Sequence, residues 1–242
     1  MNKIVGRKPV LEAINAGVDI EVIYVAYGQH GEAINKIFKS AKESGIKITQ
    51  VSLQKINEIS KTENSQGVVA IKSLTKFYEL YEVIEHSKKF EYPLLLLLDS
   101  IQDPHNLGAI LRTAECAGVH GVFITTNQSS PITETVEKIS AGAVSHLKIC
   151  KVSNLVRTIE QLKKENFWIV GSSLNNSRNY TSVDYKIPVA LVVGNEEKGI
   201  RKLVADNCDF LVKIPMSGKI DSLNVSVATG ILLFEILRQQ KN

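Results

Sequence analysis

Cysteine is scarce in this chain of 242 residues, and the few cysteines are not paired. Cys116, Cys150 and Cys208 lie far apart, and no CxxC pair occurs. Zinc sites and disulfide frameworks of small domains use closely spaced cysteines, usually in even numbers. We therefore expect neither a zinc site nor disulfide cross-links. With 44% hydrophobic residues, the chain is able to bury a core without them.

Long hydrophobic runs are also missing. The purely aliphatic runs, such as residues 94–98, are far shorter than the roughly 20 apolar residues of a transmembrane helix. The opening residues, MNKIVGRKPVLEAINAG, contain no continuous apolar segment of the kind found in a secretory signal peptide. These absences predict a cytoplasmic protein.

An excess of charge of one sign is missing as well. The chain carries 29 Lys and Arg side chains against 25 Asp and Glu, which gives a net charge of +4. Such a balance permits a nucleic-acid partner but does not require one. With 22% charged residues, the composition is that of an ordinary globular protein of one or two domains.

The common signatures of nucleotide-binding and hydrolytic enzymes do not occur. No GxGxxG follows a predicted strand, which argues against a Rossmann dinucleotide site. The loop 194–199 has the glycine spacing of a P-loop, but Ile200 and Arg201 follow where Lys and Ser or Thr are required. The five histidines form no HExxH pair, and no Ser-His-Asp order is recognisable. NTPase and serine hydrolase chemistry therefore have no support, and we expect no metal site.

The elements that the sequence does predict fall into two parts. In the first part, helices are predicted over residues 10–16 and 32–44, and strands over residues 20–26, 46–51 and 67–71. These elements predict a small α/β domain over residues 1–71. The more polar stretch 72–91 is expected to be a linker with a short helix, and residues 92–242 to form a second domain.

The second part predicts a mostly parallel sheet with helices on both faces, because short apolar strands alternate with helical segments. The predicted strands cover residues 94–98, 119–124, 146–152, 167–171, 189–193 and 210–214. The last predicted helix, residues 225–237, is apolar almost all round. It is therefore expected either in the core or against another subunit.

Three of these strands end in polar, glycine-bearing loops. The segments are LLLLLDSIQDPHNLGAILRTAECA (94–117), VALVVGNEEKGI (189–200) and LVKIPMSGKIDSLNVSVATGILLFEILR (211–238). Ligands of open α/β sheets bind outside the carboxyl ends of the strands. The three loops therefore predict one composite pocket.

The three segments resemble the motifs of the SpoU group of SPOUT RNA methyltransferases. The first motif is matched by Asn106-x-Gly108-x-x-x-Arg112, the second by Gly194-x-Glu196-x-x-Gly199, and the third by Ile214-Pro215 with Ser222-Leu223-Asn224-Val225-Ser226. The likeness is strongest to the branch that methylates the ribose 2′-oxygen of a guanosine in bacterial large-subunit (23S) ribosomal RNA. Residues 1–71 resemble the small ribosomal-protein-like RNA-binding domain that precedes many of these catalytic domains.

This resemblance implies S-adenosylmethionine as the methyl donor, ribosomal RNA as the substrate, a homodimer with its active site near the interface, and a trefoil knot in the C-terminal part. It implies catalytic roles for five residues, which are Asn106, Arg112, Glu196, Ser222 and Asn224. It implies backbone contacts with the cofactor for Gly194, Ile214 and Leu223. Because arginine stays protonated in proteins, we expect Arg112 to orient the ribose and stabilise a developing alkoxide.

Several alternatives stay open at this point. Asn106 can cap its helix, N-capping explains one of Ser222 and Asn224, and Glu196 can orient Arg112 or bind the substrate. The same reaction on a tRNA loop is an alternative function. A noncatalytic RNA-binding or ribosome-assembly protein is another, although the joint presence of the five residues argues against it.

Overall fold

The computed structural model describes residues 3–62, 64–73, 75–220 and 222–241. The chain divides into two compact units. The first contains Met1–Lys76 together with Pro131–Glu134, and the second contains Phe77–Ser130 and Thr135–Asn242. Each unit has its own sheet.

The first unit contains a four-stranded sheet with the order β1-β4-β2-β3. Its strands are β1 (Lys3–Val5), β2 (Ile20–Ala26), β3 (Lys47–Val51) and β4 (Val68–Lys72). β4 is antiparallel to β1 and to β2, whereas β3 is parallel to β2. The carboxyl ends of β1, β2 and β3 therefore lie at one edge, where β4 begins.

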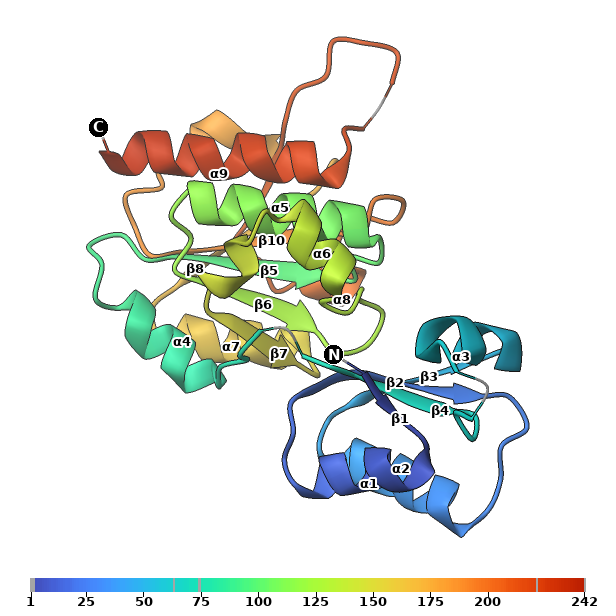
Figure 1. Ribbon diagram of the computed structural model, residues 1–242. Helices are drawn as coiled ribbons and strands as arrows, with labels where there is room; N and C mark the ends of the chain where they lie inside the picture. The colour runs from blue at the N-terminus through green and yellow to red at the C-terminus, as the bar shows by residue number, and fades with distance from the viewer. Residues whose placement is uncertain (1–2, 63, 74, 221, 242) are drawn as a thin grey trace. The chain divides into compact units, whose positions relative to one another are not determined.

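Helices cover both faces of this small sheet. α1 (Arg7–Asn15) and α2 (Glu32–Glu43) form one core with Ile23 and Val25 of β2, and α3 (Leu53–Ser60) places Ile56 against Ala26 on the other face (Figure 1). Successive side chains of a strand point to opposite faces. The nearly continuous apolar run of β2 is explained by burial on both sides.

The second unit is built on a seven-stranded sheet with the order β7-β6-β5-β10-β8-β11-β9, and the pairings among these strands are all parallel. The strands are β5 (Leu94–Asp99), β6 (Gly121–Thr125), β7 (Ile149–Val152), β8 (Trp168–Ser172), β9 (Arg178–Asn179), β10 (Val189–Gly194) and β11 (Phe210–Lys213). The chain leaves β5 toward β6 and β7, while β10 pairs with the other side of β5. That reversal of strand order is where ligands bind in open parallel sheets.

Figure 1 shows α5 (Pro104–Cys116) and α9 (Val225–Lys241) side by side over one face of this sheet, with α4 (Leu80–Ser87) and α7 (Leu155–Lys164) over the other. Leu95 and Leu97 of β5 join the core under α4 and α7. Two shorter helices, α6 (Glu134–Ile139) and α8 (Lys202–Ala205), lie between strands along the chain. Within the described residues, no helix is long and apolar enough to cross a membrane.

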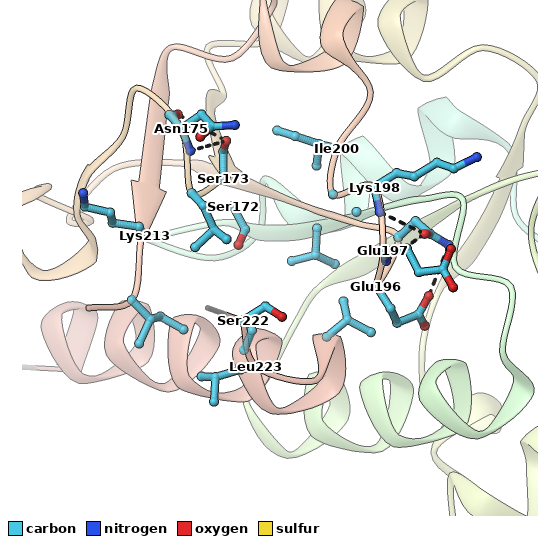
Figure 2. Close-up of a pocket in the computed structure, with 18 of the residues that line it drawn as sticks. Ser172, Ser173, Asn175, Glu196, Glu197, Lys198, Ile200, Lys213, Ser222 and Leu223 are labelled. Atoms are coloured by element: carbon cyan, nitrogen blue, oxygen red, sulfur yellow. Dashed lines mark hydrogen bonds between the residues drawn. The ribbon is translucent and has the colours of Figure 1, made fainter. Parts of the chain in front are cut away.

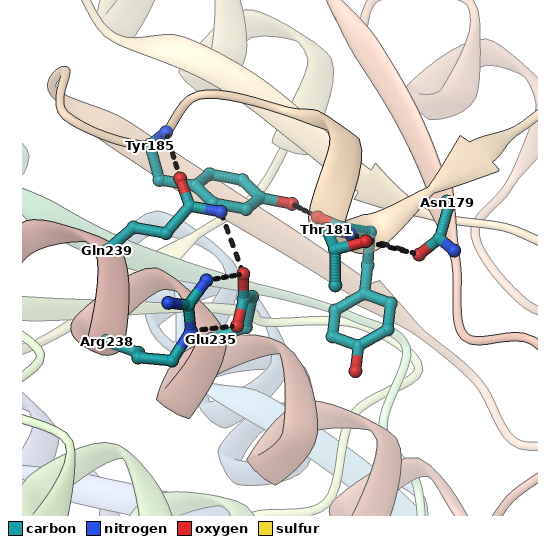
Figure 3. A network of polar contacts seen from close by, with 7 residues as sticks. Asn179, Thr181, Tyr185, Glu235, Arg238 and Gln239 are labelled. Atoms are coloured by element: carbon teal, nitrogen blue, oxygen red, sulfur yellow. Dashed lines mark hydrogen bonds and ion pairs between the residues drawn. The ribbon is translucent and has the colours of Figure 1, made fainter.

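The end of α9 is fixed to the segment before β10 by a polar network (Figure 3). Tyr185 is 1% exposed, and its hydroxyl donates to the carbonyl of Tyr180 over 2.8 Å. The Tyr185 N–H donates to Gln239 Oε1 over 3.2 Å, and Gln239 in turn donates to Glu235, which also pairs with Arg238. These bonds hold the last turns of α9 in place. Because a helix is stiff, they also fix the position of its first turn.

The expected α/β fold, with a large parallel sheet covered on both faces, is confirmed. The stretch expected to be a linker contains α4, as the sequence predicts, but β1, α3 and β9 are not predicted by it. β1 and β9 are too short to show a period-2 pattern. The trefoil knot implied by the resemblance stays a prediction.

Candidate active site

A cavity of about 410 Å³ lies at the carboxyl ends of three neighbouring strands, β10, β8 and β11. The loop after β10 and the start of α9 complete its wall. Figure 2 shows the lining side chains, with Lys198 and Lys213 at opposite ends of the view and Ser222 and Leu223 on α9's side. This is the size and place of a small-molecule site in a parallel sheet.

A second hollow, of about 590 Å³, adjoins the first. Both are bounded by the loop 195–199. The second is lined in addition by Asp103 and Asn106 at the start of α5 and by Arg201. The loop after β10 therefore belongs to two neighbouring sites. This arrangement suits a reaction between two bound molecules.

A chain of hydrogen bonds joins the three sequence motifs beside these hollows. Asn224 Nδ2 donates to Asn106 Oδ1 over 2.9 Å, and Asn106 Nδ2 donates to Glu196 Oε1 over 2.6 Å. Asn195 Nδ2 donates to the other carboxylate oxygen of Glu196 over 3.2 Å. Bonds to an ionised carboxylate are stronger than those between neutral groups. The first, second and third motifs are thereby brought to one point.

The caps of the two helices explain how these side chains are placed. The N-cap of α5 is Asp103, whose Oδ1 accepts from the His105 N–H over 2.9 Å, so Asn106 in the first turn does not cap the helix. Asn224, by contrast, caps α9 by accepting from the Ser226 N–H over 2.9 Å. Of the open alternatives, N-capping therefore applies to Asn224 and not to Asn106, and Glu196 bonds Asn106 rather than Arg112.

The buried carboxylate of Asp99 positions the loop after β10. Asp99 ends β5 opposite Gly194 and is 0% exposed. It accepts from the Arg201 N–H over 2.9 Å and from Arg201 Nε over 2.8 Å. A buried charge is costly unless it is paired and hydrogen-bonded. The pair therefore fixes the point at which the loop 195–200 returns to the sheet.

The glycine at the end of β10 is required by the chain itself. A Cβ at Gly194 would lie 2.1 Å from the Gly199 carbonyl carbon and 2.2 Å from the Ile200 nitrogen. Asn195 and Gly199 exchange backbone hydrogen bonds of 3.1 and 2.9 Å, which fold the loop back on Gly194. In the first motif, a Cβ at Gly108 would lie 2.7 Å from Ile139 Cβ, so that glycine lets α5 approach α6. Gly194 and Gly108 thus both have packing roles.

The structure brings together most of the predicted site residues. Gly194, Ile214, Ser222, Leu223 and Glu196 line the first cavity, Asn106 lines the second hollow, and Asn224 bonds Asn106. Arg112 is the exception. It is exposed on α5, lines neither hollow, and makes no hydrogen bond or ion pair with any residue in the described ranges.

Sequence reasoning missed two contributors. Residues 172–175, at the end of β8 and in the loop after it, line the cavity, although β8 is predicted and its carboxyl end lies at the same edge as the others. Asp99 was also missed, although an acidic residue that ends a run of five leucines is a signal for a partner at the strand end. Both contributors are found when the residues at the end of every parallel strand are considered, whether or not the loop that follows contains glycine.

Comparison with known protein families gives two matches that cover nearly the whole chain. Residues 93–234 match the model of the SpoU rRNA Methylase family, and residues 3–75 match that of the RNA 2′-O ribose methyltransferase substrate binding domain. A protein of Staphylococcus aureus (strain COL) named as a TrmH family tRNA/rRNA methyltransferase is 39% identical over 98% of this chain and 96% of its own length.

Solved structures show the same likeness. The AdoMet-bound rRNA methyltransferase from Sinorhizobium meliloti is 28% identical, with a TM-score of 0.64 over 98% of this chain and 86% of that chain. The TrmH/SpoU tRNA modifying enzyme of A. aeolicus is 35% identical, with a TM-score of 0.58 over 67% of this chain and 82% of that chain.

Proposed function

Because the chain belongs to the SpoU rRNA methylase family, whose members are S-adenosylmethionine-dependent RNA methyltransferases, we propose that it methylates the ribose 2′-oxygen of a guanosine in 23S ribosomal RNA. The observation that carries this proposal is the hydrogen-bonded contact of Asn224, Asn106 and Glu196. It unites residues from all three motifs between a cavity for a small molecule and a second hollow next to it.

The first cavity fits the cofactor. Apolar side chains of Val193, Ile200 and Leu223 offer a surface for a flat base, and polar residues complete the lining. The carboxylate of Glu197 suits the positive charges of S-adenosylmethionine, and the ammonium groups of Lys198 and Lys213 suit its carboxylate. Gly194, Ile214 and Leu223 are the residues proposed to hold it through their backbone. When bound, the cofactor supplies an electrophilic methyl group.

The second hollow is proposed to take the ribose. Asn106 has its amide oriented by Asn224 and Glu196, so it is fixed before a substrate arrives. Glu196, which lines both hollows, is available to accept from a ribose hydroxyl, and Ser222 is proposed to contact the substrate from the first cavity. Fixed polar groups accelerate methyl transfer because they position the reacting groups. Such positioning supplies a large part of the reduction in the activation barrier. Arg112 is proposed to stabilise the developing alkoxide as a permanent cation.

Ribosomal RNA is favoured over tRNA by the extent of the likeness. The Sinorhizobium meliloti rRNA methyltransferase matches 98% of this chain, whereas the A. aeolicus tRNA modifying enzyme matches 67%. The longer match includes the N-terminal unit, for which we propose the role of RNA substrate-binding domain over residues 1–71, joined by residues 72–91 to a catalytic domain over 92–242. The tRNA reaction is the alternative outcome of the test.

The test is to map 2′-O-methylated nucleotides in cells with and without the gene, and to repeat the assay with purified protein, labelled S-adenosylmethionine and either 23S RNA or bulk tRNA. We expect one guanosine of 23S RNA to lose its methyl group in the deletion strain and to regain it when the wild-type gene is restored. Loss of a tRNA methyl group instead would replace the substrate, and label at a base nitrogen or carbon would overturn ribose methylation.

We also propose a homodimer that forms through the outer face of α9. Val227 and Phe234 are seven residues apart and lie on one face of that helix. They are 50% and 48% exposed. Apolar side chains of this size gathered on one helix face are typical of an interface. A Phe234→Glu variant is expected to sediment as a monomer while the wild type sediments as a dimer. A wild-type monomer with full activity would contradict the proposal.

A further inference from the structure

Four segments of the first unit meet at one edge of its sheet. They follow β1, β2 and β3 and precede β4, because those three strands end where β4 begins. A hollow of about 590 Å³ lies between them, and it is lined by Arg7, Gln29, Leu53, Ser65, Gln66 and Gly67. No residue of this hollow belongs to the three motifs.

Arg7 is held rigidly on this hollow by neutral acceptors. Its Nε donates to the Gln66 carbonyl over 3.1 Å, its Nη1 to the His30 carbonyl over 3.4 Å, and its Nη2 to Gln29 Oε1. Carbonyl and amide oxygens orient a guanidinium without neutralising its charge. Among the described residues, no carboxylate pairs with Arg7. The site therefore presents a fixed positive charge that suits an anion such as a phosphate.

A glycine allows this close arrangement. Gly67 has φ +73°, and a Cβ there would lie 2.6 Å from Gln29 Cδ. Gln29 is one of the acceptors of Arg7. A side chain at position 67 would therefore push Gln29 away and remove one of the three acceptors of the guanidinium.

Two exposed hydrophobic side chains follow strands that end at this edge of the sheet. Tyr27 directly follows β2 and is 66% exposed, and Leu53 starts α3 and is 54% exposed. The Tyr27 N–H donates to the Val51 carbonyl at the end of β3 over 2.9 Å, and Leu53 follows Val51 by two residues. An exposed tyrosine at the same edge of the sheet as an arginine suits the face of an unpaired base.

We propose that this edge of the first unit binds a single-stranded segment of the substrate RNA, with a phosphate at Arg7 and an unstacked base on Tyr27. The inference rests on the proposed function, since it needs RNA to be the substrate, and it specifies which surface grips it. A duplex is a poorer fit because its bases are stacked and its major groove is inaccessible to side chains. The family match of residues 3–75 to a substrate-binding domain agrees with RNA binding by this unit, but it does not identify the residues that bind.

The test measures binding of the full-length protein to a fluorescent, unstructured 12-nucleotide RNA and to a duplex of the same length, over a range of salt concentrations. Tyr27→Ala is expected to weaken single-strand binding by about 5- to 150-fold, the effect of losing one stacked base, and to leave duplex binding unchanged. Arg7→Gln is expected to weaken binding and to reduce the slope of log K against log salt by about 0.7. Lys39→Gln, which removes an exposed charge on α2 away from the hollow, is the matched control and is expected to bind as the wild type does.

Calorimetry with S-adenosylmethionine and thermal unfolding accompany each variant, since Arg7 also holds loops together. Tyr27 is exposed, so its replacement leaves the fold intact and keeps the proposal falsifiable. Single-strand binding by Tyr27→Ala equal to that of the wild type, or an equal loss in Lys39→Gln, overturns the proposed surface while the methylation reaction stands. If the variants lose binding as expected but the wild type transfers no methyl group to RNA ribose, the surface stands and the proposed reaction fails.

Discussion

Asn106 donates a 2.6 Å hydrogen bond to the carboxylate of Glu196, across 90 residues of sequence. The bond fixes an amide and a carboxylate at the boundary between the cavity proposed for the cofactor and the hollow proposed for the ribose. Glu196→Gln keeps the size and an acceptor for Asn106 but removes the negative charge.

We expect Glu196→Gln to lower the rate of methyl transfer by about 100-fold, the usual effect of removing one fixed polar group from a reacting site. Binding of S-adenosylmethionine is expected to change by less than about threefold, because Asn106 keeps an acceptor. Single-turnover methylation and calorimetry measure the two. Glu115→Gln, which changes an exposed carboxylate on α5 that lines neither hollow, is the control. A similar loss in both variants would show a general charge effect and remove Glu196 from the site.

Asp99→Asn is expected to loosen the loop after β10. One side-chain oxygen becomes an NH₂ group that faces an Arg201 donor, so one of the two buried hydrogen bonds is lost. Losses of this kind cost about 1–3 kcal/mol, which corresponds to roughly 5- to 150-fold weaker cofactor binding. Because Asp99 acts through the loop, the rate at saturating cofactor is expected to recover to near wild type.

Calorimetry and a kcat-against-KM comparison test the role of Asp99. Asp206→Asn, which changes an exposed aspartate after α8, is expected to behave as the wild type. A loss of rate that persists at saturating cofactor would place Asp99 in the chemistry rather than in loop positioning.

The sequence predicts the sheet and the site to different degrees. The strand runs 94–98 and 189–193 predict β5 and β10 to within one residue, because buried parallel strands are continuously apolar. The order of the strands along the chain does not indicate that β10 pairs with β5. The contact of Asn106 with Glu196 therefore follows only from the assembled sheet. The roles of Gly194 and Gly108 were also not visible, since the atoms that a side chain would strike belong to segments brought there by folding.

Gly194→Ala is expected to destabilise the protein rather than to block the cavity alone. The new methyl group would meet the backbone of Gly199 and Ile200 at 2.1–2.3 Å, and backbone moves less readily than a side chain. A loss of about 1–3 kcal/mol of unfolding free energy is expected in denaturant melts, together with weaker cofactor binding. Gly218→Ala, where a Cβ meets only the Ile220 nitrogen at 4.0 Å, is the control. Unchanged stability in Gly194→Ala would mean that the loop does not fold back as described.

Burial lowers the pKa of His120 to about 4, with a smaller effect from His86. The folded value lies below the unfolded value of about 6.5, so the unfolded state takes up protons first as the pH falls. The contribution of His120 to the stability of the fold is therefore complete above about pH 6.5 and decreases toward pH 4. His120 Nδ1 accepts from the Leu94 N–H over 2.9 Å, and His120→Asn keeps an acceptor near that position. Urea melts at pH 7 and pH 5 are expected to differ less in the variant than in the wild type. An unchanged difference would assign the pH dependence to other groups.

Arg112 stands apart from the hydrogen-bonded cluster of Asn106, Glu196 and Asn224. It follows Asn106 by six residues of α5, which is about 1.7 helical turns, so the two side chains point to different faces of the helix. Asn106 meets the loop after β10, while Arg112 is exposed. A catalytic Arg112 therefore needs the RNA, or a second copy of the chain, to complete its surroundings.

We expect Arg112→Ala to leave folding and cofactor binding unchanged, because no described residue depends on its side chain, and to lower methyl transfer by about 100-fold or more. Arg112→Lys keeps the charge but loses the planar fork, so an intermediate rate would indicate bidentate binding of a phosphate or ribose. Arg157→Ala on α7, at the opposite face of the sheet, is the control for charge. Rates are measured with labelled donor and RNA. Transfer by Arg112→Ala within a few-fold of the wild type would remove Arg112 from the active site and leave Asn106 and Glu196 as its centre.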